Sequence, residues 1–339
     1  MFINLIQYRN TILFALLSVL WGTSFVAISV GLEALPPLLF AALRYDIAGV
    51  LLLAYAVIAA DQWRPHGKDE WLLVSIGGIL VIGVHFAFLF IGQTYVTSGI
   101  AAIVLSTAPI LTPLFAWVLL PDERVGISGA IGILLGLVGV ALIASPDPSA
   151  VDGTAVGVLL LVLSAASFAF GAVLVKRLPA RMELIPSQAW MMLIGAVSLH
   201  IGSPLRGEAG ISTVAWNIET VISLLYLAIV AGAIGFVIYF DLLEEIGAIE
   251  ISLVNYIVPV VAAVFGWLML SESITGQTVS GFAVIFVGFV LLKWDTVSSQ
   301  IIHIQARLSR GHSVENEYVD ISAIQSENQT QRRSYPADD

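Results

Sequence analysis

Hydrophobic residues along this chain are gathered into long runs, with short polar segments between them. Ten runs approach the length of about 20 residues that a helix needs to cross the hydrocarbon core of a bilayer. They lie at 11–32, 36–59, 71–93, 98–120, 125–144, 155–175, 185–203, 218–240, 249–270 and 276–293. Lipid cannot satisfy the edge of an open sheet, and the runs lack the alternation of a β-barrel. The pattern therefore predicts an all-α integral membrane protein with about ten transmembrane helices.

The composition supports this class and excludes several others. The chain is 58% hydrophobic and 11% charged, whereas soluble domains carry roughly 25% charged residues. The net charge of -10 argues against nucleic acid as a partner. Cysteine is absent, and no metal-spaced cluster of His, Asp and Glu or phosphate-binding loop occurs. We therefore expect no metal, no cofactor and no enzymatic activity.

The basic residues predict how the helices are oriented. If the N-terminus is cytoplasmic, eight Lys and Arg residues outside the tail fall on the cytoplasmic side. They are Arg9, Arg64, Lys68, Arg124, Lys176, Arg177, Arg181 and Lys293. Only Arg206 falls in an external loop. This asymmetry predicts a multi-pass protein of the cell (plasma) membrane with both termini in the cytoplasm.

The chain also contains an internal repeat. The segment PILTPLFAWVLLPDERVG from Pro109 matches PVVAAVFGWLMLSESITG from Pro259, at a spacing of about 150 residues. The sequence thus divides into a first five-helix repeat at 1–150, a second at 151–293 and a polar cytoplasmic tail at 294–339. Because each repeat has an odd number of spans, the second must enter the membrane inverted. Inverted repeats are typical of transporters.

These features resemble a known family. A Trp-Gly pair in the first run, the ALRYD sequence at Ala42–Asp46 and the duplicated Pro-Phe-Glu-Gly block are similar to the EamA branch of the drug/metabolite transporter superfamily, over about residues 11–293. The resemblance implies a ten-helix carrier that moves small metabolites, often outward. It also implies a central cavity lined by the first four helices of each half, with the fifth helix of each half at the periphery.

The predicted function is secondary transport, with export of small organic metabolites by alternating access around a midplane cavity. The expected partners are a small-molecule substrate and the lipid bilayer, while a coupling ion or proton and a homodimer remain open. The alternative is a non-transporting membrane sensor or scaffold that acts through its C-terminal tail, which has seven acidic and four basic residues.

The sequence WGTSF at residues 21–25 places a glycine, two hydroxyls and an indole in the middle of the first run. Gly22 allows another helix to approach closely or the helix to bend, which makes it a structural or hinge position. In the alternative interpretation, Trp21, Thr23 and Ser24 form part of a polar cavity wall and bind substrate.

Arg44 lies about two turns into the second run. A charge at this depth costs about 3 kcal/mol or more unless it reaches the interface, pairs or faces water. One interpretation is a snorkelling or structurally paired side chain, and Asp46 could neutralise it. The other is a substrate-binding anchor for an anionic or carboxylate group.

Four further positions are candidates. His85 is a histidine well inside a span and is expected either to bind substrate or carry a coupling proton, or to be a hydrogen-bonded structural imidazole. Asn255 lies inside the ninth run and is a candidate substrate-binding residue. Pro109 and Pro259 each leave a carbonyl without a donor, and such interruptions at matching positions are expected to be hinges near a transport site.

Two other features predict structure rather than chemistry. Glu123 and Glu272 precede the fifth and tenth runs, where they are expected to complement the positive N-termini of the helices that follow. Glycines in the fifth run share one helix face and predict tight packing, either within the chain or between subunits. These glycines are Gly126, Gly129, Gly132, Gly136 and Gly139.

Overall fold

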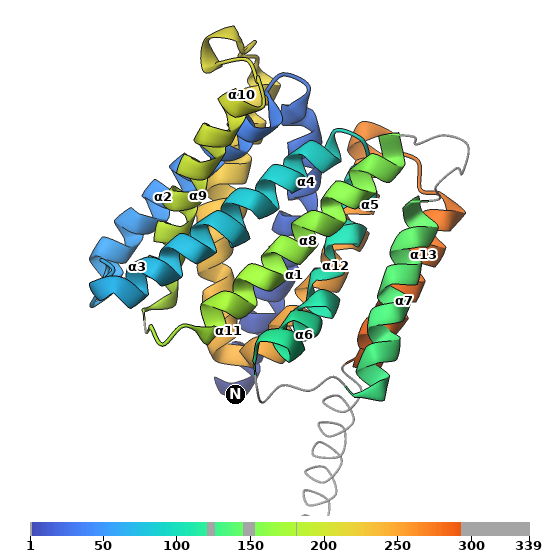
Figure 1. Ribbon diagram of the computed structural model, residues 1–339, viewed down its shortest axis with the longest axis horizontal. Coiled ribbons are helices and arrows are strands. Elements are labelled where there is room, and N and C mark those ends of the chain that lie inside the picture. Colours follow the sequence, from blue (N-terminus) through green and yellow to red (C-terminus); the bar gives the residue numbers. More distant parts are fainter. Residues whose placement is uncertain (1, 121–125, 145–152, 181, 293–339) are drawn as a thin grey trace, which may run out of the picture. The chain divides into compact units, whose positions relative to one another are not determined.

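The structure, a computed structural model, describes residues 2–120, 126–144, 153–180 and 182–292, and within them all regular secondary structure is helical. Nine helical segments of these residues are long and apolar enough to cross a membrane. A tenth helix, Gly276–Leu292, is also apolar but shorter, at 17 residues. The all-α membrane fold predicted from the hydrophobic pattern is confirmed (Figure 1).

We number the ten segments as spans 1 to 10. The single-helix spans are α1 (Phe2–Leu32, span 1), α2 (Pro37–Ala59, span 2), α7 (Ile127–Ala144, span 5), α8 (Gly153–Arg177, span 6), α9 (Leu184–Leu205, span 7) and α13 (Gly276–Leu292, span 10). Span 3 combines α3 (Gly67–Ile76), the π-helix η1 (Gly77–Val84) and α4 (His85–Gln93), and span 4 combines α5 (Ser98–Leu105) and α6 (Ala108–Leu119). Span 8 combines α10 (Ile218–Leu225), the π-helix η3 (Tyr226–Ile234) and α11 (Gly235–Ser252) as far as Gly247, and span 9 ends with α12 (Val254–Leu270). A short 3₁₀ turn, η2 (Ile211–Thr213), lies between spans 7 and 8.

Spans 3 and 8 occupy the same place in the two repeats, and both contain a π-helical segment. Such segments are rare and frequently occur at functional sites. Their glycines let a neighbouring helix pack closely. A Cβ on Gly78 would lie 2.7 Å from the side chain of Ile194 in α9, and one on Gly232 would lie 3.0 Å from that of Ala48 in α2. The glycine-rich sequences of these spans therefore have a packing reason.

The two proline positions behave differently. Span 4 is interrupted at Ser106 and Thr107, directly before Pro109, which then occupies the first turn of α6 where no N–H is needed. By contrast, α12 continues through Pro259, and its break lies earlier, at Leu253. The expected pair of interruptions at matching positions is thus present at Pro109 but displaced by about six residues from Pro259.

The helices pack as two groups. Each group combines the first two helices of one repeat with the third and fourth spans of the other. In group A, α8 and α9 of the second repeat pack on spans 3 and 4 of the first. In group B, α1 and α2 of the first repeat pack on spans 8 and 9 of the second. Figure 1 shows α8 running beside α4 in group A. Exchanging the repeats converts one group into the other, as expected for an inverted duplication.

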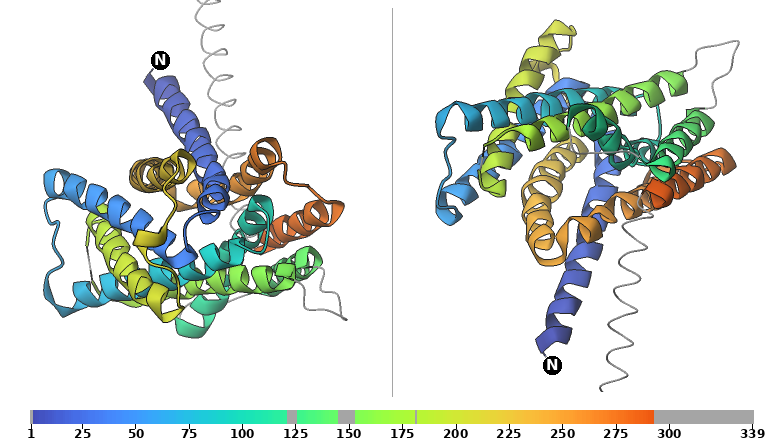
Figure 2. Two further views of the ribbon diagram at one scale, coloured as in Figure 1. Left: turned by 90° about the horizontal axis from the view of Figure 1, so that it is seen from above. Right: turned by 60° about the horizontal axis from the view of Figure 1, so that its bottom comes forward.

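Spans 5 and 10 lie side by side, away from most of the other helices (Figures 1 and 2). The glycine face of α7 packs on α13. A Cβ on Gly139 would lie 2.7 Å from the carbonyl oxygen of Gly281, and one on Gly288 would lie 2.6 Å from that of Gly132. This face therefore makes close contacts within the chain, which is one of the two alternatives that the sequence left open.

Candidate functional site

The Trp21 and Thr23 side chains of α1 both contact the π-helix of span 8. Trp21 Nε1 donates a hydrogen bond of 3.1 Å to the carbonyl of Ala231, and its ring lies 5.3 Å from that of Tyr239. Thr23 Oγ1 and the hydroxyl of Tyr226 share a hydrogen bond of 2.6 Å. A π-helix shifts its internal hydrogen bonds, so side chains from a neighbour can supply donors to its carbonyls. Trp21 and Thr23 thus make polar contacts between spans 1 and 8, which Arg9 and Asp241 also join by an ion pair.

Gly22 and Ser24 have structural partners. A Cβ on Gly22 would lie 2.5 Å from the side chain of Val261 and 3.1 Å from the carbonyl oxygen of Val258, so α1 approaches α12 closely here. Ser24 Oγ donates to the carbonyl of Trp21 in its own helix at 2.6 Å. The WGTSF segment thus joins α1 to both spans 8 and 9.

An equivalent contact occurs in the other group. The sequence SAASF at 164–168 of α8 corresponds to WGTSF, and Ser164 takes the place of Trp21. Ser164 Oγ donates to the carbonyl of His85 at 2.8 Å and lies 2.8 Å from His85 Nδ1. Ser167 Oγ donates to the carbonyl of Leu80, within η1, at 2.8 Å. In both groups, therefore, the first helix of one repeat bonds a π-helical carbonyl of the other.

The large and the small residue of this contact change places between the two groups. In group B the large side chain is Trp21, and it packs against Gly235, where a Cβ would lie 2.9 Å from its Nε1. In group A the small partner is Ser164 and the ring belongs to His85. Gly235 and His85 are 150 residues apart, the spacing of the repeat. In group B, therefore, the ring is on the first helix of a repeat and the small residue on the third, and in group A the order is reversed.

Arg44 is buried beside a cluster of rings that includes His85. Its guanidinium Cζ lies 4.8 Å from the ring centroid of Tyr45 and 5.1 Å from that of Phe86, and the Phe86 ring lies 4.4 Å from that of His85. The Asp46 carboxylate does not supply the counter-charge that the sequence suggested. It accepts a hydrogen bond of 2.7 Å from His200 Nε2 in α9.

Asn255 lies in the first turn of α12, and its amide donates to the carbonyl of Ser252 at 3.1 Å. Within the described part of the chain, this hydrogen bond does not join it to Trp21, Arg44 or His85. The structure therefore brings Arg44 and His85 together. Trp21 and Thr23 lie in the equivalent contact of group B, while Asn255 stands apart from both.

A network of polar groups, of which Gln93 and Ser98 are buried, joins group A to group B. The sequence analysis did not single it out. Gln93 Nε2 of α4 donates to the carbonyl of Phe25 and, at 2.9 Å, to Ser29 Oγ of α1. Ser98, the first residue of α5, shares a hydrogen bond of 3.1 Å with Ser29 Oγ and donates through its hydroxyl to Glu272 at 2.9 Å. We call these five residues the gate network. Its signal in the sequence is Gln93, an amide at the end of an apolar run.

Glu272 caps a different helix from the one expected. Its carboxylate accepts hydrogen bonds of 2.9 and 3.1 Å from the backbone N–H of Ser98, at the N-terminus of α5. The expectation that Glu272 serves the following helix, α13, is therefore wrong, although its role of complementing a helix N-terminus holds. The expectation for Glu123 lies outside the described residues.

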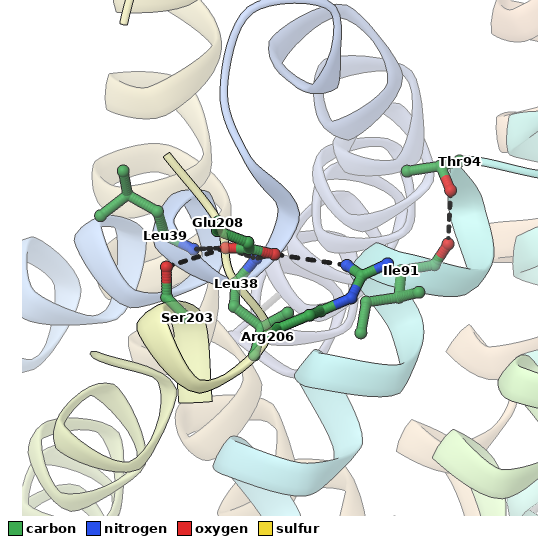
Figure 3. Close-up of polar contacts among 7 residues, drawn as sticks. All are labelled: Leu38, Leu39, Ile91, Thr94, Ser203, Arg206 and Glu208. Carbon is green, nitrogen blue, oxygen red and sulfur yellow. Dashed lines mark hydrogen bonds and ion pairs between the residues drawn. The ribbon is translucent and has the colours of Figure 1, made fainter. Parts of the chain in front are cut away.

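Glu208 makes a second cap of this kind (Figure 3). Its carboxylate accepts from the backbone N–H groups of Leu38 and Leu39 at 3.1 Å, which is the N-terminus of α2. Ser203 and Arg206 also donate to it, and only 6% of the Glu208 side chain is exposed. Both caps link the second repeat to the first at one end of the bundle. We call this the distal end, which is defined by loops 33–36, 94–97, 206–217 and 271–275. The opposite end, with loops 60–66 and 178–180, is the proximal end.

The two ends differ in how the groups are joined. At the distal end α5 packs against α1 and α12 of group B. At the proximal end α6 packs on α8 and α7 instead. Polar contacts between the groups are also present at the proximal end, beside α2 and α9, where Glu183 accepts from Gln62 N and Trp190 donates to the Trp63 carbonyl. Around spans 1, 4 and 9, therefore, the groups are joined at the distal end.

Comparisons with known proteins agree with this architecture. The model of the EamA-like transporter family matches the chain twice, at residues 9–145 and 155–294. The uncharacterized transporter YvbV of Bacillus subtilis is 28% identical over 284 residues, covering 84% of this chain and 91% of that protein. The uncharacterized inner membrane transporter YedA of Escherichia coli K12 is also 28% identical over 284 residues, covering 82% and 87%.

Two further matches extend the comparison. The WAT1-related protein At3g02690, chloroplastic, of Arabidopsis thaliana is 28% identical over 281 residues, covering 81% of this chain and 67% of that protein. A crystal structure of another protein matches with a TM-score of 0.60 and 22% identity, covering 84% of this chain and 98% of the other, which supports the fold alone.

The fold, the exchanged groups and the duplicated match define a multi-pass membrane transporter built from two repeats. The chain belongs to the EamA-like transporter family.

Proposed function

We propose that this transporter is a secondary carrier that exports small organic metabolites by alternating access, with a substrate site between groups A and B near the midplane. The observation that carries the proposal is the uneven joining of the two groups. Around spans 1, 4 and 9 they are joined at the distal end, as expected of a carrier closed on that side. The opposite state would arise by exchanging the roles of the repeats.

The candidate residues receive roles on this basis. Trp21, Thr23, Ser24 and Asn255 belong to group B, His85 belongs to group A, and we propose that they contact substrate when the groups separate. Their hydrogen bonds to backbone and neighbouring side chains would be exchanged for bonds to the substrate. Gly22, Pro109 and Pro259 would allow the helices to shift, since each lies at a close approach or lacks a backbone donor.

A counterflow assay tests the proposed function. Purified protein in liposomes loaded with one unlabelled solute should accumulate the labelled form of that solute, in a screen across amino acids, nucleosides and organic acids. Deleting residues 294–339 should leave the flux intact. A protein that shows no flux for any of these solutes, or whose cellular role is lost on tail deletion while its membrane part stays folded, would favour the sensor or scaffold.

The orientation in the cell membrane is proposed from the basic residues, and it can be tested directly. Reporters inserted after Ile143 and beside Arg206 should be external, because these positions follow odd-numbered spans. Reporters after Arg64, after Arg177 and in the tail should be cytoplasmic. Accessibility to a membrane-impermeant reagent in whole cells is the measurement. The same orientation places the distal end outside, because its loop 206–217 contains Arg206. An external tail would contradict both the even number of spans and this placement of the distal end.

A further inference from the structure

Arg44 has an unusual environment among the charged residues of this protein. It is 5% exposed, and it is the one Arg, Lys, Asp or Glu of the described part of the chain that is buried as a whole residue, since Glu208 buries its side chain but not its backbone. Its Nε is enclosed and has no hydrogen-bond partner in that part of the chain. Buried charges in proteins are ordinarily paired, because an unpaired charge in a low-dielectric interior is strongly unfavourable.

The obvious partner is engaged elsewhere. Asp46, two residues along α2, bonds His200 on the neighbouring helix. The other neighbours of the guanidinium are the faces of Tyr45 and Phe86. Aromatic faces attract a cation but accept no in-plane hydrogen bond, so the planar donor fork of the guanidinium remains available.

A second unpartnered donor lies beside the first. The hydroxyl of Tyr45 is buried and has no hydrogen-bond partner in the described residues, and the residue is 0% exposed. The imidazole Nδ1 of nearby His85 is already engaged by Ser164, so it does not compete for this position. Two enclosed donors, one of them cationic, thus lie together against aromatic rings.

We propose that Arg44 and Tyr45 form a subsite for the carboxylate of a small organic anion, with Phe86 packing on the apolar part of the same molecule. This inference rests on the proposed function and specifies the substrate class. A carboxylate has the planar geometry and charge to accept from the guanidinium and from a hydroxyl at once. The substrate is therefore a monocarboxylate with an apolar body.

The experiment compares carboxylates with their own neutral amides. Purified full-length protein is titrated with matched pairs such as benzoate and benzamide, phenylacetate and phenylacetamide, and hexanoate and hexanamide. Protection against thermal unfolding is followed by tryptophan fluorescence. At least one carboxylate should bind, and its amide should bind about ten-fold or more weakly, because the charge-assisted hydrogen bond is lost.

The variants assign the effect to this subsite. Arg44→Gln should remove the preference for the carboxylate, and Arg44→Lys should retain part of it, because the charge remains but the fork is lost. Arg64→Gln is the matched control, since this exposed arginine also lies over an aromatic ring, 4.1 Å from that of Trp63. It should bind as the unmodified protein does.

Several results would overturn the subsite. They are equal binding of acid and amide, binding by none of the carboxylates, and an unchanged preference in Arg44→Gln. The comparison of acid with amide uses the unmodified protein, so it holds even if Arg44→Gln fails to fold. If counterflow finds a neutral substrate that Arg44→Gln still carries, the subsite is wrong while the transporter proposal stands.

Discussion

Gln93→Leu should open the distal end of the protein. The amide of Gln93 donates to the Phe25 carbonyl and to Ser29 Oγ, and both bonds join group A to group B. Leucine has a similar size but no donor. Each neutral hydrogen bond contributes about 1 kcal/mol net, so losing two should raise the population of the distally open state by roughly 30-fold.

Labelling from the outside measures this shift. The chain has no native cysteine, so Ser29→Cys supplies a single reporter within the gate network. The reporter itself replaces the Ser29 hydroxyl, so Gln93→Leu then removes only the bond to the Phe25 carbonyl. A membrane-impermeant maleimide should therefore label the thiol about five-fold faster in the Gln93→Leu background, because only a hydrated thiol forms the thiolate readily. Gln62→Leu is the matched control, since its amide bonds Glu70 and the Arg64 carbonyl at the proximal end. Equal labelling in the Gln93→Leu and Gln62→Leu backgrounds would show that the gate network does not hold the distal end closed.

Gly22→Val should destabilise the folded protein. Its Cβ would fall 2.5 Å from the Val261 side chain, so α1 and α12 would have to separate. Overpacking of this kind costs about 1–3 kcal/mol. The measurement is the midpoint of thermal unfolding in detergent, compared with that of Gly276→Val.

Gly276 is the appropriate control because it also lies in a helix but has no atom within 4 Å of an added Cβ. Its substitution should leave the midpoint nearly unchanged. If Gly22→Val instead unfolds at the same temperature as the unmodified protein but no longer transports, the glycine acts as a hinge rather than as a packing contact.

The spans were predictable because bilayer thickness imposes a length on each apolar run. Duplication was equally visible, since Pro109 and Pro259 are members of long matching segments. The sequence also identified Arg44 as a residue in need of a partner. It did not show that Asp46 bonds His200 instead, because positions on different helices meet only once the helices have packed.

The gate network could not be derived in the same way. Glu272 was expected to serve the helix after it, since local reasoning considers the nearest N-terminus. In the structure the inverted repeats bring the N-terminus of α5 to the same end of the bundle, and Glu272 caps it. The π-helices were likewise missed, because a glycine-rich apolar run has the same hydrophobic pattern in either helix type.

The measurement that tests alternating access most directly is a reversible cross-link across the gate network. Ser29 and Ser98 belong to different groups, and their hydroxyl oxygens are 3.1 Å apart. Cysteines at both positions should form a disulfide on oxidation and hold the distal end closed. Once counterflow has identified a substrate, its flux should stop on oxidation and return on reduction, while both single-cysteine variants remain active throughout. Unchanged flux through fully cross-linked protein would contradict a cycle in which groups A and B separate at this end.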